Sequence, residues 1–188
     1  MCPPISVWPD PSRLSDYVKG HSIVKPVFIL NGSNLNMLGK REPHLYGTTT
    51  LAEIKESCLA LARELSLDCD FRQTNYEGQM IDWLQEAFER HAAVIINPAG
   101  FSFGSIPVLD ALKLIQKPVI EVHITNIHKR EELYRHSRVS LVATGVICGL
   151  GPEGYLLALR AVASALKEAL PADTMSHPEQ VLSKLPMP

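Results

Sequence analysis

Short apolar runs alternate with amphipathic stretches through the middle of this chain. In residues 50–66, apolar side chains recur every three or four positions, at Leu51, Ile54, Cys58, Leu61 and Leu65. This spacing places them on one face of a helix, and Thr50 with Glu53 provides a capping box at its start. The pattern therefore predicts a helix that buries one side.

Five further apolar runs have the length of buried strands, and helical stretches separate most of them. The strands are expected at 26–31, 67–73, 93–97, 118–123 and 145–150. Further helices are expected at 77–90, 104–115 and 153–169, and a long loop-rich stretch precedes the fifth strand. Strands that alternate with helices form a parallel sheet covered on both faces, because right-handed crossovers place helices on each side. The expected fold is α/β and doubly wound, with the flavodoxin-like strand order 2-1-3-4-5.

The residues on either side of this pattern are rich in proline. We expect residues 26–170 to form a single domain, which suits a chain of 188 residues. Residues 1–25 and 171–188 are weakly patterned. They are expected to be an N-terminal arm and a C-terminal tail, either disordered or laid on a neighbouring subunit.

Charge and composition argue against several functions. The formal net charge is -2 and no run of Lys or Arg is present, so binding to nucleic acid or to an anionic membrane is not expected. No segment reaches the roughly 18 to 20 apolar residues of a membrane span, and prolines interrupt the N-terminus where a signal peptide needs an apolar stretch. The four cysteines lack CxxC spacing and are expected to be reduced thiols. These features predict a cytoplasmic protein.

Polar residues gather after the first, third and fourth predicted strands. These strands are neighbours in the proposed order, and ligands of open parallel sheets bind beyond the carboxyl ends of the strands. The segment after the first strand is long and contains Asn34, Arg41 and Tyr46, as expected of a binding loop or lid. A surface loop that uses asparagines as turn formers would have the same pattern. His123 stands at the end of the fourth strand, where a lone histidine is more often structural.

Two common kinds of site are not favoured by the motifs. The glycines match neither GxGxxG nor GxxxxGK[ST], so a nucleotide phosphate site is not expected. His123, His128 and His136 lack HExxH spacing and the cysteines lie elsewhere, so no metal is expected.

Five separated motifs resemble one known family. They are LNGSNLNMLGKREPHLYGTTTL (30–51), FRQTNYEG (71–78), INPAG (96–100), IEVHITNIHKRE (120–131) and GVICGLGPEGYLLAL (145–159). In order and spacing, these motifs resemble the type II 3-dehydroquinate dehydratases. The resemblance implies a flavodoxin-like fold, no metal or cofactor, and a homo-oligomer built from trimers, usually a dodecamer. It also implies the removal of water from a cyclic 3-oxo carboxylate through an enolate.

The resemblance assigns catalytic roles to individual residues. Tyr46 matches the family's catalytic base, and Arg41 matches the arginine beside it. Asn34 matches the asparagine that holds a water near the enolate oxygen. His123 matches the general acid, which the carboxylate of Glu121 would orient.

The resemblance also points to substrate-binding positions. Asn97 and the backbone amides of Ile124 and Thr125 match the groups that hold the substrate carboxylate. Asp110 matches a residue that reaches the site of the adjacent subunit, and Arg130 matches a further arginine of the family.

The chemistry of the residue types fits these roles. A tyrosine is protonated near neutral pH, so Tyr46 can act as a base only if a cation such as Arg41 stabilises its phenolate. A carboxylate beside His123 keeps the imidazolium available to protonate a departing hydroxyl. The acid and the base follow different strands and can act on opposite faces of a ring, as an anti elimination requires.

Three positions depart from the family at the end of the site that binds the ring hydroxyls. Phe103 stands where the family has a histidine that contacts these hydroxyls, and Tyr134 stands where it has an arginine that binds the far hydroxyl. Leu109 stands in place of a neighbouring arginine. Arg135 is one place from Tyr134 and could compensate only if the loop shifts.

These departures leave alternative functions open. The chain is either a working 3-dehydroquinate dehydratase with unusual substrate contacts, or an enzyme with the same enolate chemistry on a related, less hydroxylated cyclic oxo or hydroxy carboxylate. A third alternative is a non-catalytic member that binds a small acid or serves as an oligomeric scaffold. Arg41, Tyr46 and His123 argue against this third alternative, because a scaffold has no physical need for them.

Overall fold

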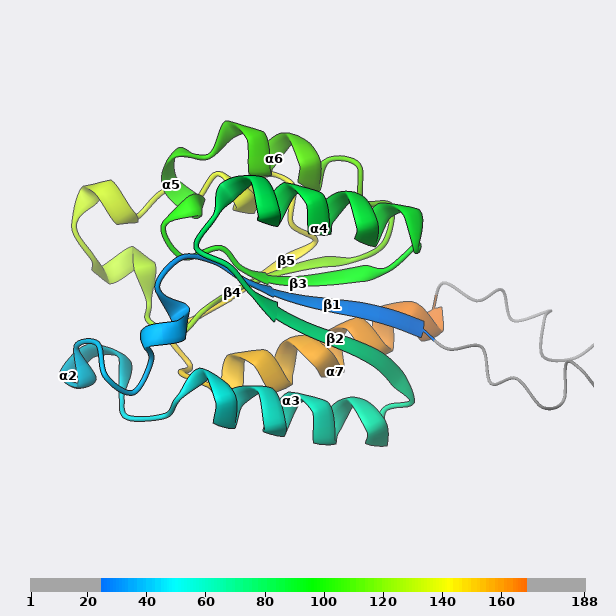
Figure 1. Ribbon diagram of the computed structural model, residues 1–188, viewed down its shortest axis with the longest axis horizontal. Coiled ribbons are helices and arrows are strands. Elements are labelled where there is room, and N and C mark those ends of the chain that lie inside the picture. Colours follow the sequence, from blue (N-terminus) through cyan, green and yellow to red (C-terminus); the bar gives the residue numbers. More distant parts are fainter. Residues whose placement is uncertain (1–24, 169–188) are drawn as a thin grey trace, which may run out of the picture.

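A parallel sheet forms the centre of the protein, whose computed structural model describes residues 25–168. The strands are β1 Lys25–Asn31, β2 Leu67–Gln73, β3 Ala93–Asn97, β4 Val119–His123 and β5 Gly145–Cys148. Their order is β2-β1-β3-β4-β5, and all neighbours are parallel (Figure 1). This confirms the doubly wound, flavodoxin-like fold. The predicted arm at 1–25 and tail at 171–188 lie outside the described residues, except for Lys25, which begins β1.

Helices cover both faces of the sheet. In Figure 1, α3 Leu51–Glu64 and α7 Glu153–Glu168 lie on one face, and α4 Glu77–Glu89 and α6 Ile106–Leu112 lie on the other. Because successive strand residues point to opposite faces, β1 supplies both cores. Val27 and Ile29 pack with residues of α3 and α7, whereas Phe28 and Leu30 pack with residues of α4 and α6.

Helix α3 begins where its capping box predicts. The side chain of Thr50 accepts a hydrogen bond from the backbone N–H of Glu53, and the carboxylate of Glu53 accepts one from the backbone N–H of Thr50 at 2.7 Å. Ile54, Cys58 and Leu61, from the predicted apolar face, are buried. The capping box and the burial of one apolar face therefore both favour a helix at these residues.

The helix expected at 104–115 is α6, which is shorter than predicted, and a separate short helix, α5, precedes it. α5 Phe101–Gly104 ends before Ser105, and α6 begins after it. Ser105 has φ −80° and ψ 97°, outside the helical range, and its hydroxyl accepts a hydrogen bond from the N–H of Val108 at 3.0 Å. Pro107 then lies in the first turn of α6, where its missing N–H breaks no helical hydrogen bond. The serine cap and the proline start α6 two residues after the predicted start, and α5 was not predicted.

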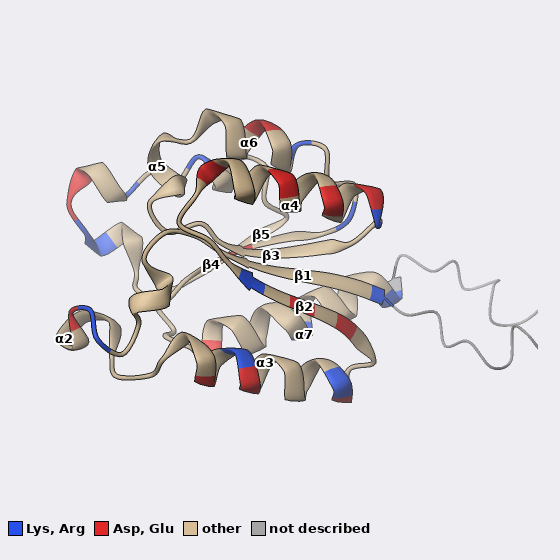
Figure 2. Cartoon of the chain, viewed as in Figure 1, with Lys and Arg blue, Asp and Glu red and all other residues tan. Residues whose placement is uncertain are grey.

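The loops at the carboxyl edge of the sheet contain short helical turns. These are η2 Leu35–Met37 and α2 Pro43–Tyr46 after β1, and η3 Ile127–Lys129, η4 Glu132–Tyr134 and η5 Val139–Leu141 after β4. Strand β5 ends at Cys148 rather than at the predicted residue 150. Figure 2 shows acidic and basic residues mixed along α3 rather than separated by sign. Within residues 25–168, no helix combines the length and the apolar character needed to cross a bilayer.

Candidate active site

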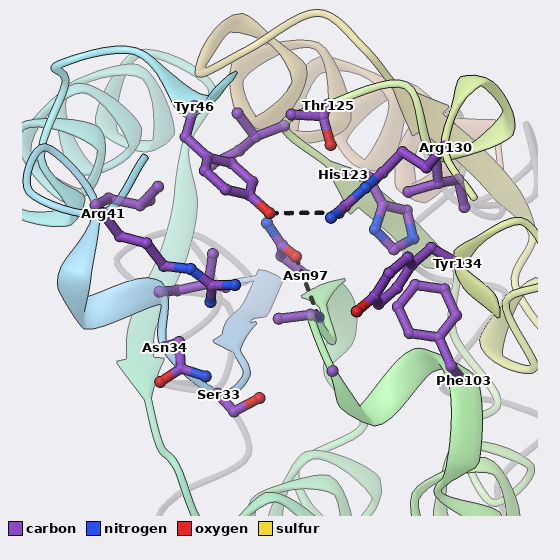
Figure 3. Close-up of a pocket in the computed structure, with 16 residues that line it drawn as sticks. Ser33, Asn34, Arg41, Tyr46, Asn97, Phe103, His123, Thr125, Arg130 and Tyr134 are labelled. Atoms are coloured by element: carbon purple, nitrogen blue, oxygen red, sulfur yellow. Dashed lines mark hydrogen bonds between the residues drawn. The ribbon is translucent and has the colours of Figure 1, made fainter. Parts of the chain in front are cut away.

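A cavity of about 220 Å³ lies at the carboxyl edge of the sheet, where the sequence predicts the chemistry (Figure 3). Its walls come from the segments after β1, β3 and β4: Ser33, Asn34, Leu35, Leu38, Arg41 and Tyr46; Asn97, Ala99, Gly100 and Phe103; and His123, Ile124, Thr125, Ile127, Arg130 and Tyr134. Residues that are far apart in the sequence therefore face one space.

Gly32 allows the segments after β1 and β3 to approach each other. Its N–H donates a hydrogen bond to the carbonyl of Asn97 at 2.8 Å. A Cβ at Gly32 would lie 2.1 Å from the carbonyl oxygen of Pro98, so only glycine fits without moving the backbone. This close approach places Asn34 and Asn97 on the same cavity.

His123 and Glu121 form a buried pair on β4. The ring nitrogen Nε2 of His123 lies 2.7 Å from Oε1 of Glu121, whose side chain is fully buried. The hydroxyls of Ser137 and Ser140 also donate to this carboxylate. Burial alone would raise the pKa of Glu121, but the hydrogen bonds from His123, Ser137 and Ser140 outweigh it and hold the pKa below its usual value. The ionised carboxylate fixes a proton on Nε2 and leaves Nδ1 available to a ligand.

Tyr46 has two arginines beside it, and Arg130 is the one that contacts its hydroxyl. The Nη1 of Arg130 donates to the hydroxyl oxygen at 3.3 Å. The guanidinium of Arg41 lies over the ring, 5.7 Å from its centre, and its Nε donates to Glu42 at 3.0 Å. Arg41 is thus partly neutralised by its sequence neighbour, and Arg130 is the cation placed to stabilise a phenolate at this oxygen.

Asn97 is held in a fixed orientation in the cavity wall. Its Nδ2 donates to the hydroxyl of Tyr155 at 2.8 Å, and its Oδ1 accepts from the N–H of Ala99 at 3.3 Å. The Tyr155 hydroxyl in turn donates to Oδ1 of Asn31 at 2.7 Å. One N–H of Asn97 is left over by these contacts.

The backbone amides of Ile124 and Thr125 complete the polar end of the cavity. Both residues line it, and in the described part of the chain neither N–H makes a backbone hydrogen bond outside the sheet and helices. Together with the remaining N–H of Asn97, these two amides form a set of hydrogen-bond donors that contains no carboxylate. Such a set suits an anionic group of a ligand.

The opposite end of the cavity is aromatic. The rings of Phe103 and Tyr134 meet edge to face, with their centres 5.3 Å apart and an angle of 81° between their planes. The guanidinium of Arg130 lies over the Tyr134 ring, 4.4 Å from its centre. This end therefore combines a hydrocarbon wall with a phenolic hydroxyl and one cation.

Three predicted residues do not line the cavity. Glu121 lies behind His123, as described above, and acts on the cavity only through it. Asp110 is exposed on α6 and pairs with Lys113 at 3.4 Å. Arg135 donates from Nε to the carbonyl of Arg130 at 2.6 Å. The guanidinium of Arg135 thus closes a backbone turn and does not replace the arginine missing at Tyr134.

The sequence did not indicate the partners of these side chains. Ser137, Ser140 and Tyr155 were not singled out, and the role of Arg130 at the Tyr46 hydroxyl was assigned to Arg41. The Arg130–Tyr46 contact joins residues 84 positions apart, so no local pattern predicts it. Within residues 25–168, no three His, Cys, Asp or Glu side chains lie close enough to share a metal ion.

Comparisons with known proteins identify the family to which this chain is similar. The family model for class II dehydroquinases matches residues 25–163. A protein of Brucella canis named 3-dehydroquinate dehydratase is 54% identical over 146 residues, covering 78% of this chain and 93% of the relative. The crystal structure of type II dehydroquinase from Propionibacterium acnes has a TM-score of 0.74 and 45% identity, and covers 77% of this chain and 99% of that one.

A more divergent structure shares the fold as well. The 3-dehydroquinate dehydratase-like protein from Bifidobacterium longum has a TM-score of 0.60 and 31% identity, and covers 77% of this chain and 99% of that one. The family model, matched at residues 25–163, spans the whole sheet and all the cavity segments. On this sequence and structural evidence, the chain belongs to the class II dehydroquinase family.

Proposed function

We propose that this chain is a hydro-lyase that removes water from 3-dehydroquinate through an enolate. One observation carries the proposal. A tyrosine hydroxyl bonded to an arginine and a histidine bonded to a buried carboxylate face the same small cavity, beside a set of N–H donors. The names of the relatives support this choice of substrate.

The donors at the polar end orient the substrate. The amides of Ile124 and Thr125 and the free N–H of Asn97 bind its carboxylate. Binding at a fixed point holds the ring between Tyr46 and His123, and this positioning lowers the entropy cost of the reaction.

Tyr46 then removes a proton from the carbon next to the ketone. Its phenolate is stabilised by Arg130, whose Nη1 lies 3.3 Å from the hydroxyl oxygen. The C–H bonding electrons move onto the ketone oxygen and form an enolate. Asn34, which lines the cavity, supports this negative charge through a water molecule.

His123 completes the elimination as the general acid. The enolate electrons return to form the carbon–carbon double bond as the C–O bond of the neighbouring hydroxyl breaks. The imidazolium donates its proton to the departing oxygen, which leaves as water. The buried carboxylate of Glu121, 2.7 Å from Nε2, orients the ring for this transfer.

The test is direct turnover of 3-dehydroquinate, followed by the ultraviolet absorbance of the conjugated enone product. The purified chain should generate this absorbance, and Tyr46→Phe should abolish it while substrate binding persists. Tyr76→Phe, at an exposed tyrosine outside the cavity, is the matched control. A chain that binds 3-dehydroquinate but never forms the enone would contradict the proposal.

The aromatic end favours a second candidate substrate. Phe103 offers a substrate hydroxyl no hydrogen bond, and an unmade hydrogen bond in a closed site costs about 1 to 3 kcal/mol. A cyclic 3-oxo carboxylate with fewer ring hydroxyls would avoid this cost. A higher kcat/KM for a ring-deoxy analogue than for 3-dehydroquinate would favour this candidate, and Phe103→His should then reverse the preference.

The chain also fits a cytoplasmic homo-oligomer built from trimers, with a dodecamer as the default. Val146 on the edge strand β5 is exposed, as are Leu150 and Leu157 nearby in the sequence. Exposed apolar residues on a sheet edge favour contact with another copy. In a trimer, Asp110 would reach the cavity of the adjacent subunit. The mass in solution, from light scattering after gel filtration, tests this assembly.

A further inference from the structure

Arg130 lies between the side chains of two tyrosines (Figure 3). Its Nη1 donates to the hydroxyl of Tyr46 at 3.3 Å, and its Cζ lies 4.4 Å from the centre of the Tyr134 ring. Among the described residues, no Asp or Glu side chain forms an ion pair with Arg130. The guanidinium is therefore held by a ring face and by the base itself.

Phe103 contacts the Tyr134 ring, and Arg138 bonds to the backbone of the segment that contains Phe103. Phe103 packs edge to face against that ring, with the ring centres 5.3 Å apart. The backbone N–H of Arg138 donates to the carbonyl of Ser102 at 2.8 Å, and its Nε donates to the carbonyl of Phe103 at 3.3 Å. These bonds tie α5 to the segment that follows Tyr134, so the two rings keep a defined geometry.

An aromatic partner has a specific effect on a cation. A carboxylate beside Arg130 would hold it but would also neutralise its charge, and this would weaken its effect on a phenolate. The face of a ring attracts the guanidinium through its quadrupole and leaves the full positive charge in place. Arg130 on Tyr134 therefore remains a strong cation for the Tyr46 hydroxyl.

We infer that Tyr134, braced by Phe103, is a positioning residue that holds the guanidinium of Arg130 against the hydroxyl of the base, Tyr46. This inference rests on the proposed function, because it assigns a role within the same reaction. It gives the two aromatic residues a function in activating the base, in addition to any effect on the choice of substrate.

Three variants separate the ring of Tyr134 from its hydroxyl and from the fold. Tyr134→Phe keeps the ring and removes the hydroxyl, whereas Tyr134→Leu removes both. Leu133→Ala is the matched control, because Leu133 is on the same turn, η4, and is 71% exposed outside the cavity. Circular dichroism and thermal unfolding establish that each variant is folded. Phe103→Leu is a further variant, which removes the edge-to-face contact with the Tyr134 ring and leaves Tyr134 itself unchanged.

The main readout is the pH dependence of kcat on the limb where the base loses its proton. The other charged or titratable side chains on the cavity are Arg41 and His123, and all the variants keep both. Tyr134→Leu should lower kcat about tenfold and move this limb to higher pH by about one unit. The two effects correspond, because a tenfold change in rate and a shift of one pH unit represent the same free energy. Tyr134→Phe should keep the limb in place, whatever it does to KM. Phe103→Leu should shift it in the same direction as Tyr134→Leu but by less, and Leu133→Ala should match the unmodified chain.

Two results would overturn the inference. If Tyr134→Phe and Tyr134→Leu move the pH limb equally, the hydroxyl and not the ring is responsible. If Tyr134→Leu raises KM and leaves the limb in place, Tyr134 is a substrate contact and does not position Arg130.

A titration without substrate separates this inference from the proposed function. The tyrosinate absorbance of Tyr46 is obtained as the difference between each protein and its Tyr46→Phe counterpart. Its midpoint should move to higher pH in Tyr134→Leu and stay in place in Tyr134→Phe. If the unmodified chain does not convert 3-dehydroquinate, the proposed function fails, yet this titration still decides the role of Tyr134. An unmoved midpoint in folded Tyr134→Leu would contradict the inference.

Discussion

Removing one buried hydroxyl, in Tyr155→Phe, should weaken both the fold and the carboxylate-binding end of the cavity. Tyr155 is fully buried, and its hydroxyl donates to Asn31 and accepts from Asn97 at 2.7 and 2.8 Å. Phenylalanine fills the same space but leaves Oδ1 of Asn31 and one N–H of Asn97 without a partner. Each buried polar group left unpaired costs about 1 to 3 kcal/mol, so the expected loss for the two groups is roughly 2 to 6 kcal/mol. This is a large part of the about 5 to 15 kcal/mol that stabilises a typical domain.

Urea unfolding at a fixed protein concentration measures this loss, with Tyr76→Phe as the control because Tyr76 is 77% exposed. The freed amide of Asn97 should also raise KM for a carboxylate substrate several-fold, with a smaller effect on kcat. A loss below about 0.5 kcal/mol with an unchanged KM would refute the reasoning, because it would mean that the buried network does not hold Asn97.

Three further predictions concern pH and backbone strain. Hydrogen bonds hold the pKa of Glu121 below its usual value of 4.5, so its ionised carboxylate stabilises the fold above pH 4.5, and this stabilisation disappears as the pH falls. Glu121→Gln should therefore reduce the loss of unfolding free energy at acid pH, measured by urea unfolding at a series of pH values. An unchanged dependence of the unfolding free energy on pH would count against this cause. Burial and the nearby Cys69 raise the pKa of the Cys58 thiol from 9.0 to about 12, so the unfolded chain ionises first and stability should fall as the pH rises above 9.0. Cys58→Ala should reduce this alkaline loss, measured in the same way, whereas an equal loss would contradict the cause. Ala99 has φ 49°, a left-handed conformation that favours glycine, so Ala99→Gly should raise the unfolding free energy by up to about 1 kcal/mol, and a lower Tm would show that the strain is absent.

The sequence predicted most of the fold because its signals are local. The continuous apolar run at 26–31 and the alternation of strands with helices indicate a parallel sheet, and five strands favour the flavodoxin-like order. The short helix α5 was not predicted, and α6 begins two residues after its predicted start, although Ser105 and Pro107 are ordinary helix-start residues.

The candidate site was predicted as a set of residues but not as a set of contacts. Strand ends and a family resemblance placed Tyr46 and His123 in one cavity. The hydrogen bonds that orient them join distant segments, such as Arg130 to Tyr46 and Ser137 to Glu121. Such contacts depend on how the loops fold over the sheet edge, and no local spacing encodes them.

The central claim is that Tyr46 forms an enolate before His123 releases the hydroxyl. Proton exchange in deuterium oxide, measured by NMR on 3-dehydroquinate with the His123→Ala variant, tests it most directly. The base and Arg130 are intact in this variant, so deuterium should enter the carbon next to the ketone while little enone forms. The same variant with Tyr46→Phe added provides the background rate of exchange. Exchange well above that background is the predicted result, and exchange no faster than background would contradict the enolate mechanism.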